Sequence, residues 1–325
     1  MSRLGPPCWP KPCVACWMRM PEMDMAELPV QLPREPASPA AARARFFNSG
    51  NAFNIKLPAV PAAEFSGVAE AALAPDAPTG LLACDQSGAI GCGFPATSPL
   101  MLARYATVAA GEALELAFAS TGLIAYVIQG AGEVTAGGET FLYGAGDVFL
   151  LPGTAQLAAT ARSVLWLVTN EPMLAFEALA PAPAMLAPVH YPAAEIERQL
   201  ALITGMGSND TTSGHALIFS SDGLEAWRNI TPTLTLSLNT LPPGQAQRAH
   251  RHNSAAITLV VQGEDCHSMI AGERHCWSQW NTLVTPAGDA HSHHNGGGVQ
   301  ARFLIVQDGG LHYHARSMGF QFLEE

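Results

Sequence analysis

The 325-residue sequence is poor in charged side chains, and basic residues are the scarcer kind. Charged residues make up 13%, and 16 Lys and Arg stand against 27 Asp and Glu, which gives a net charge of −11. This balance argues against a polyphosphate ligand or an anionic membrane surface as the main partner. Because the sequence has neither a basic patch nor a helix-turn-helix segment, we expect no nucleic-acid partner.

Long apolar runs are also missing. No run approaches the ~20 residues that a membrane-spanning helix needs, and the N-terminus has no clean signal-peptide core. We therefore expect no membrane partner and a cytoplasmic location. Hydrophobic residues nevertheless reach 48%, which at this chain length suits two globular domains of ordinary size.

The cysteines do not suggest a disulfide framework. Their number is seven, which is odd, and they are scattered, whereas secreted frameworks are dense and usually even in number. Cys13 and Cys16 have zinc-ligand spacing, but no second pair completes four ligands, so we expect a reduced pair. Both belong to a leader, residues 1–45, that we predict to be disordered. Several methionines between Met18 and Met25 leave alternative translation starts open within it.

From Phe46 onward, short apolar runs alternate with Gly, Pro and Asn turn signals, a texture typical of an all-β sandwich or barrel. A Pro- and Ala-rich stretch at 180–192 predicts a linker. Residues 193–203 follow, with Ile196 and Leu200 at helical spacing, and predict one helix. The expected strands are 100–108, 124–130, 147–153 and 163–169 before the linker, and 234–244, 255–263, 281–288 and 302–309 after it.

The two β regions look like copies of one unit, because turns and strands follow in the same order. An internal duplication is the simplest explanation. We therefore predict a first barrel at 46–175 and a second barrel at 176–325. The residues that fall in register are Gly111 with Gly244, Gly130 with Gly263, Gly138 with Gly272, and Pro152 with Pro286.

Only the second copy carries histidines where the copies differ. His250 and His252 are two residues apart in a predicted strand, so both side chains point to the same face. A neighbouring strand can bring His291 between them. Three neutral imidazoles suit Fe(II), Zn, Cu, Ni or Mn and leave positions open for water or substrate. The first copy lacks these ligands, so we expect it to have a structural or interaction role.

These motifs resemble those of the cupin superfamily. Gly244, five residues and then His-X-His match its first motif, and Pro286-X-Gly288-X-X-His291-X-X-X-Asn295 matches its second. The resemblance covers about Pro99 to Val306. It implies an all-β fold of two tandem cupin barrels, each a double-stranded β-helix or jelly roll, with a short helical linker. Cupins commonly pair, so we expect a homo-oligomer, a dimer or tetramer, with segment 46–83 as a pairing arm.

The second barrel resembles a narrower group. Most metal-binding cupins supply a glutamate after the dyad, but here 253–257 reads Asn-Ser-Ala-Ala-Ile. A three-histidine centre without that carboxylate is typical of gentisate, salicylate and 1-hydroxy-2-naphthoate dioxygenases, whose motifs are similar to AHRHNSAAITLVVQGE and HSHHN. By resemblance, His250, His252 and His291 would hold Fe(II), with Mn, Ni and Zn as alternatives, and His293 would line the pocket. The implied reaction is O₂-dependent opening of a small aromatic acid that bears a hydroxyl.

Arg248, Asn239 and His293 are the candidates for binding the substrate carboxylate or moving a proton. Arg251 alternates with two inward histidines and is expected to point away. The chain departs from the group in three ways: its metal motifs are C-terminal, Thr258 stands where an Arg binds the carboxylate, and Asn239 replaces a Gln. Another metal-dependent cupin enzyme (an isomerase, decarboxylase or hydrolase) and a non-catalytic cupin that binds a small ligand are the alternatives.

The remaining histidines and tryptophans have simpler interpretations. Residues 312–314, His-Tyr-His, have the spacing of a second dyad but no third ligand, so we expect them near the barrel mouth or in solvent. His267 and His275 flank a glycine turn and are expected to be exposed. We expect Trp277 and Trp280 to pack in the core or between the barrels.

Overall fold

The computed structural model describes residues 24–53, 55, 57–182, 186–205 and 215–323. The chain divides into two compact units, Met1–Leu57 and Pro58–Glu325. The predicted reduced cysteine pair lies outside the described residues.

The described part of the leader contains local structure that the prediction of disorder did not include. Helix α1 (Pro39–Ala42) is one turn long, and Gln31 pairs with Phe46 in an isolated bridge. The Ser38 hydroxyl accepts a hydrogen bond from the Ala41 amide at 3.1 Å. A serine cap followed by proline favours a helix start, which explains why the turn forms here.

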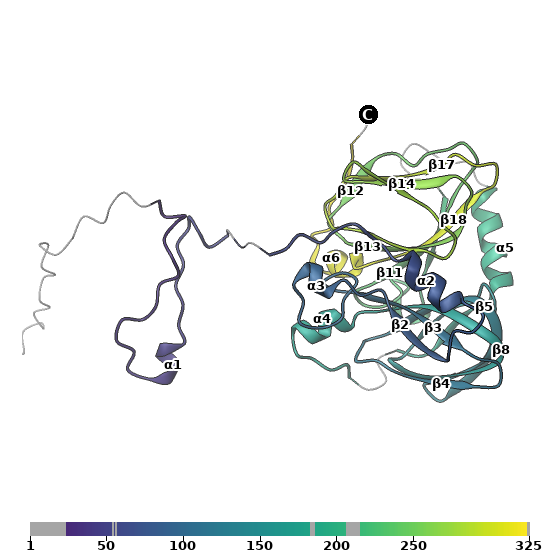
Figure 1. Cartoon of the computed structure of the whole chain (residues 1–325), viewed down its shortest axis with the longest axis horizontal. Helices are drawn as coiled ribbons and strands as arrows, with labels where there is room; N and C mark the ends of the chain where they lie inside the picture. Colours follow the sequence, from purple (N-terminus) through teal and green to yellow (C-terminus); the bar gives the residue numbers. More distant parts are fainter. Residues whose placement is uncertain (1–23, 54, 56, 183–185, 206–214, 324–325) are drawn as a thin grey trace, which may run out of the picture. The chain divides into compact units, whose positions relative to one another are not determined.

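The first barrel is an eight-stranded antiparallel sheet (Figure 1). The order is β2-β3-β8-β5-β7-β9, while β4 pairs with β8 and β6 with β5. The four strands predicted here are confirmed as β3, β5, β7 and β8. The strands are β2 (Gly80–Ala83), β3 (Leu102–Val108), β4 (Ala113–Ala117), β5 (Leu123–Ala136), β6 (Glu139–Gly144), β7 (Val148–Leu151), β8 (Thr154–Thr169) and β9 (Val189–Tyr191).

Apolar side chains fill the interior of the first barrel. In the first copy, residues 117–119 and 156–158 stand near the positions of the His dyad and of His291. Phe118 and Leu157, from these two stretches, are both buried in its core. Two of the three glycine pairs share a positive φ angle, +81° and +71° at Gly111 and Gly244 and +83° and +88° at Gly138 and Gly272, whereas Gly130 has +93° and Gly263 has no positive φ. The two barrels therefore share a backbone plan, but hydrocarbon occupies the first where imidazoles occupy the second.

The second barrel is a sandwich of two antiparallel sheets, and Figure 1 shows β12, β14 and β17 in one layer and β11 and β13 in the other. The six-stranded order is β1-β16-β13-β18-β11-β10, and the five-stranded order is β15-β14-β17-β12-β19. The fold class, two tandem cupin-like barrels, is confirmed. The strands are β1 (Ala63–Glu64), β10 (His215–Phe219), β11 (Thr235–Leu241), β12 (His250–His252), β13 (Ala256–Gln262), β14 (Cys266–Ile270), β15 (Glu273–Cys276), β16 (Thr282–Thr285), β17 (His291–Asn295), β18 (Ala301–Gln307) and β19 (Phe320–Phe322).

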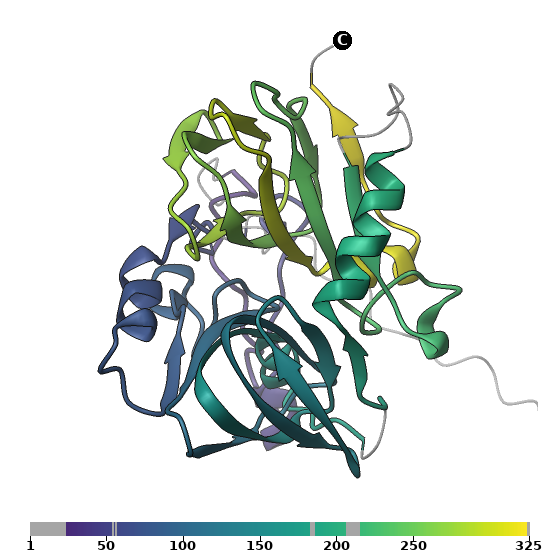
Figure 2. The ribbon, with the colours of Figure 1, turned by 90° about the vertical axis from the view of Figure 1, so that its right-hand side faces the viewer.

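Helix α5 (Ala193–Thr204) is the predicted linker helix, and it lies beside β10 (Figure 2). It buries Ile196 and Leu200, the two residues at helical spacing. None of the described helices is long and apolar enough to cross a membrane. The other helices are α2 (Ser66–Leu73), α3 (Ser87–Ile90), α4 (Glu171–Phe176), the 3₁₀ turn η2 (Asp222–Leu224) and α6 (Gly309–Ala315).

The two barrels share one apolar core cluster, which contains buried residues of both. At this seam the Trp166 indole and the Tyr105 hydroxyl both contact Thr282 Oγ1, at 3.0 and 2.7 Å. Trp280 lies 6.1 Å from the Tyr126 ring, so it packs between the barrels as predicted. Part of segment 46–83 is used within the chain, because β1 pairs with β16 and β2 with β3.

Candidate metal centre

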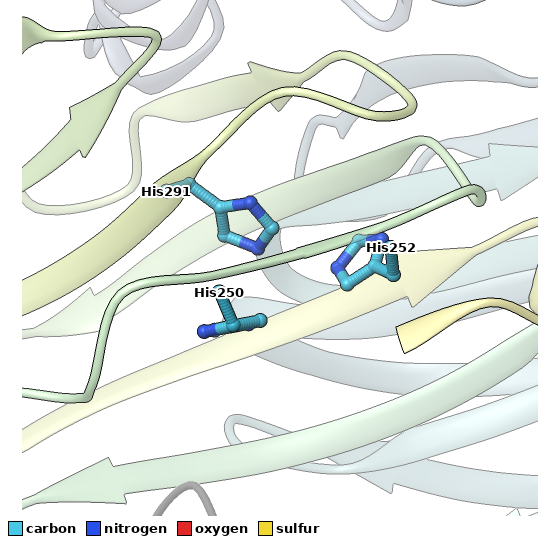
Figure 3. Close-up of side chains that lie close together, drawn as sticks. All are labelled: His250, His252 and His291. Atoms are coloured by element: carbon cyan, nitrogen blue, oxygen red, sulfur yellow. The ribbon is translucent and has the colours of Figure 1, made fainter. Parts of the chain in front are cut away.

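Strand β12 presents two histidines on its inner face. His250 and His252 are buried, whereas Arg251 between them is exposed and donates to Gln321 Oε1 at 2.7 Å. This alternation confirms the predicted orientation of all three residues. His291 opens β17 and is the register partner of His250. One ligand atom from each histidine lies within 4.8 Å of the other two, and the three rings converge (Figure 3).

Backbone carbonyl groups fix the orientation of all three rings. Because a carbonyl oxygen only accepts, each Nδ1 must carry the proton, and each Nε2 keeps its lone pair for a metal. The same two-residue offset recurs at every ligand, so the local chain itself sets the tautomer. The Nδ1 atoms of His250, His252 and His291 donate to the carbonyl oxygens of Arg248, Ser254 and Asp289 at 2.8, 2.8 and 2.9 Å.

The three rings are neutral at neutral pH. Burial lowers the pKa of His291 to about 3 and also lowers the pKa of His250 and His252. Metal ligation requires neutral imidazole, so the cluster is already in the binding form. Within the described chain, this histidine cluster contains no carboxylate. Asn253, at the start of the stretch where most cupins have glutamate, instead donates to the Ser317 carbonyl at 2.8 Å.

His293 has the opposite tautomer. The Trp277 indole, which can only donate, hydrogen-bonds Ser268 Oγ at 2.8 Å, and Ser268 Oγ lies 2.8 Å from His293 Nδ1. Among the described residues no other acceptor is present for the buried Ser268 hydroxyl, so its hydrogen points at Nδ1. The proton of His293 is therefore on Nε2. Burial lowers the pKa of His293 well below its ordinary value, and the ring is a neutral donor rather than a fourth metal ligand.

A cavity of about 270 Å³ lies over the histidines, with walls from both sheets. Asn239, Thr258 and Gln307 contribute amide and hydroxyl groups from β11, β13 and β18. Gln307 Nε2 lies 3.3 Å from His252 Nε2. None of the described residues that line the cavity is Lys, Arg, Asp or Glu. The apolar part of the wall consists of Ala216, Ile218, Ala256, Ile305, Met318 and Phe320, with the Tyr313 ring beside them.

The predicted substrate residues are only partly brought together. Asn239 and His293 line the cavity, but Arg248 does not: its guanidinium lies 4.3 Å from the centroid of the Phe322 ring. Gln247 lines the cavity instead. Residues 247–249 precede β12 and are not in a strand, so strand alternation does not direct the Arg248 side chain into the cavity.

Several lining residues were missed by the sequence reasoning. Gln307 and Ile305 alternate along β18 and share its inner face, so a polar residue in an inward position of that strand was the available signal. Tyr313, Met318 and Phe320 come from α6 and the chain after it. No hydrophobic periodicity in the sequence predicted that these three residues line the cavity.

The other histidines lie outside the three-histidine cluster. Residues 312–314 lie on α6, near the barrel mouth and in solvent as predicted: Tyr313 lines the cavity, His312 Nδ1 contacts Asn253 Nδ2 at 3.1 Å, and His314 is exposed. The prediction that His267 and His275 are exposed is wrong. Both are half-buried, because the β14–β15 hairpin lies against β17 and β1: His267 stacks on His294 at 4.6 Å, and His275 contacts Glu64 at 2.8 Å.

Comparison with known families agrees with this geometry. Residues 237–307, which contain both histidine motifs, match the family described as "Cupin domain", and residues 102–156 match "AraC-like ligand binding domain". The part of the second barrel that carries the histidines thus matches a cupin family, and the fold is that of two tandem cupin-like barrels.

Known proteins that resemble part of the chain include dioxygenases. The chain is 28% identical over 120 residues to 1-hydroxy-2-naphthoate 1,2-dioxygenase of Nocardioides sp. (strain KP7), covering 37% of this chain and 30% of that protein. It is 33% identical over 84 residues to gentisate 1,2-dioxygenase of Haloferax sp., covering 25% and 24%. The match thus spans less than a third of either relative. Salicylate 1,2-dioxygenase from Pseudaminobacter salicylatoxidans shares the fold, with a TM-score of 0.68 at 15% identity over 82% of this chain and 89% of that one.

Proposed function

We propose that the chain is a non-haem Fe(II) dioxygenase that opens the ring of a hydroxylated aromatic carboxylic acid. The observation that carries the proposal is the set of three neutral imidazoles, each with Nδ1 fixed on a carbonyl and no carboxylate beside them. This donor set fits Fe(II), with Mn, Ni and Zn as alternatives. The similarity of the second barrel to gentisate and hydroxynaphthoate dioxygenases supports it.

His250, His252 and His291 would hold the iron, which would bind oxygen donors of the substrate and supply the redox chemistry with O₂. The lining described above carries no full charge of its own. A chelating phenolate and carboxylate would therefore balance the metal charge without a protein cation. Asn239 and Thr258 present uncharged donors to such a carboxylate, in place of a guanidinium.

The remaining residues bind and orient the substrate. Ile305 and Phe320 give the cavity apolar walls, which hold an aromatic ring and exclude water. His293 lines the same cavity and keeps its proton on Nε2, so its neutral ring is suited to donate a hydrogen bond to a substrate oxygen. Trp277 and Ser268 act through His293 and are positioning residues in this scheme.

A second candidate follows from the lack of a cation in the lining. The same three histidines would also serve a metal-dependent cupin enzyme of another kind, or a ligand-binding cupin, whose ligand chelates through oxygens without a carboxylate. Cytoplasmic location and assembly into a dimer or tetramer stay predictions.

Metal analysis of anaerobically purified protein, followed by oxygen-uptake assays, tests the proposal. We expect about one iron per chain, which His250→Ala and His291→Ala lose, while His314→Ala, a change of an exposed histidine, retains it. Iron-loaded protein is then expected to consume O₂ with a member of a panel of salicylates, gentisate and hydroxynaphthoates. Bound iron without uptake across the panel would favour the second candidate, and wild-type protein that cannot be loaded with any metal contradicts both.

A further inference from the structure

A groove adjoins the metal cavity and shares part of its wall. It has a volume of about 410 Å³, and Ile218, Gln307 and Tyr313 line both spaces. Gln307 therefore borders the groove and also contacts the histidine cluster, because its Nε2 lies 3.3 Å from His252 Nε2. A ligand that chelates the metal and is longer than one ring would extend into this groove.

Part of the groove wall is apolar and left open to solvent. Trp227, Tyr313 and Ile218 are 47%, 52% and 53% exposed, although large apolar side chains are normally covered. Exposed apolar side chains gathered around an opening are typical of a binding site. Trp227 is supported from behind by the His314 ring at 5.8 Å, so its indole is placed to pack on a ligand.

Arg228 supplies the groove with a positive charge, which the metal cavity lacks. Its side chain is exposed, and no described carboxylate lies within ion-pair distance, 4.0 Å, of its guanidinium. Arg228 and Ile218 also line a second surface hollow, whose other residues include Asp222 and Glu225. Because neither of these carboxylates lines the groove, an anion is favoured in the groove over the hollow.

We infer that the groove is a second substrate subsite, which binds a carboxylate at the end of the substrate that is distant from the metal. Arg228 pairs with this carboxylate, and Trp227 packs on the ring or chain that leads to it. The inference rests on the proposed function, because it assigns the part of the substrate that does not chelate. It also gives a reason why no cationic side chain lines the metal cavity: the positive charge that selects the substrate belongs to Arg228, in the adjoining groove.

Ligand binding to zinc-loaded protein tests the subsite without turnover. Isothermal titration calorimetry would compare 2-hydroxybenzoate with 2-hydroxybenzoates that carry a second carboxylate on C5, either directly or at the end of a two- or four-carbon chain. We expect one of the dicarboxylates to bind about fivefold more tightly than the parent, the strength of a solvent-exposed Arg–carboxylate pair. Arg228→Gln removes this advantage and leaves parent affinity unchanged. Arg274→Gln, at an exposed arginine on β15, is the charge-matched control and retains it.

The outcomes separate the subsite from the ring-opening proposal. If the parent binds and supports O₂ uptake by the iron-loaded chain, but no dicarboxylate gains affinity or the gain survives Arg228→Gln, the subsite is refuted alone. If dicarboxylates bind in an Arg228-dependent manner while no compound supports O₂ uptake, the subsite stands and the dioxygenase proposal falls. If no compound binds, both are wrong. Trp227→Ala is expected to weaken dicarboxylates more than the parent, and an equal effect on both counts against the packing role.

Discussion

Asp308 provides a quantitative test of how the chain is anchored next to β12, the strand that carries His250 and His252. It follows β18, is 5% exposed, and its Oδ1 accepts a hydrogen bond from the Ala255 amide at 2.8 Å. Ala255 is three residues after His252, so this bond anchors the chain directly behind the dyad. Burial raises the pKa of Asp308 from 3.8 to about 7. Asp308 thus anchors the chain behind the dyad, but its ionised form lowers the free energy of unfolding, by an amount that depends on pH.

The sign and size of that cost follow from linkage. Between pH 4 and pH 7 the folded chain binds more protons at Asp308 than the unfolded chain does, so stability falls as pH rises. Each pH unit in this window corresponds to about 1.4 kcal/mol. The shift from 3.8 to about 7 therefore makes ionised Asp308 destabilising by roughly 4 kcal/mol at pH 8. At pH 5 most of this cost is absent.

The perturbation is Asp308→Asn, which keeps an oxygen for the Ala255 amide and removes the charge. Urea unfolding of metal-free protein at pH 5, 6.5 and 8 would compare it with wild type and with Asp76→Asn, a change of an exposed aspartate. The stability of Asp308→Asn relative to wild type is expected to rise by about 3 kcal/mol from pH 5 to pH 8. The histidine contributions are common to both proteins and cancel. A difference that stays constant with pH, or one matched by Asp76→Asn, refutes the reasoning.

Three further predictions concern the Ser268–His293 hydrogen bond, the metal and the first barrel. Ser268→Ala is expected to lower the turnover of iron-loaded protein about tenfold to 100-fold with iron content unchanged. Ser292→Ala is the control and is expected to leave turnover near wild type. Loss of iron in Ser268→Ala would contradict a positioning role. Metal at a thousandfold excess over its Kd is expected to stabilise the fold by about 4 kcal/mol in thermal unfolding, and an equal gain in His252→Ala would place the metal elsewhere. Gly130→Ala is expected to destabilise strongly in urea, because φ is +93° and its Cβ would lie 2.4 Å from the Arg162 carbonyl oxygen; Gly67→Ala, with no neighbour within 4 Å, is the control.

The sequence predicted that three histidines come together because their placement depends on local rules. His250 and His252 share a face through strand alternation, and His291 follows a fixed-spacing turn motif, so three residues from two strands were identified without coordinates. The apolar runs likewise predicted β11, β13, β16 and β18, since buried strands leave a short hydrophobic signature. The helix α5 was equally local, because two apolar residues four apart define its buried face.

The cavity wall was less predictable because it depends on how distant segments pack. Arg248 precedes β12 and is not in a strand, so no sequence pattern fixed the direction of its side chain. The His-Tyr-His sequence at 312–314 has the spacing of a second dyad, but tertiary packing stabilises a helix there, which begins at Gly309 despite the low helix propensity of glycine. Trp227 and Arg228 lie in a stretch without periodicity. The groove could not be predicted from the sequence, because it forms where the turn after η2 lies beside β11 and α6.

The strand β1 belongs to the sheet of the second barrel, although it is synthesised before the first barrel. Residues made before the first barrel pair with β16 in the second, and the Phe65 amide donates to the Asn281 side chain 216 residues later. Contacts across such separations close late and slow folding. Because β1 is synthesised first, it is available as soon as β16 has been made, and a second barrel expressed without its upstream segment would expose the edge of β16 to unrelated strands. Residues 63–65 thus cover an edge of the barrel that holds the histidines, although they precede the first barrel in the sequence.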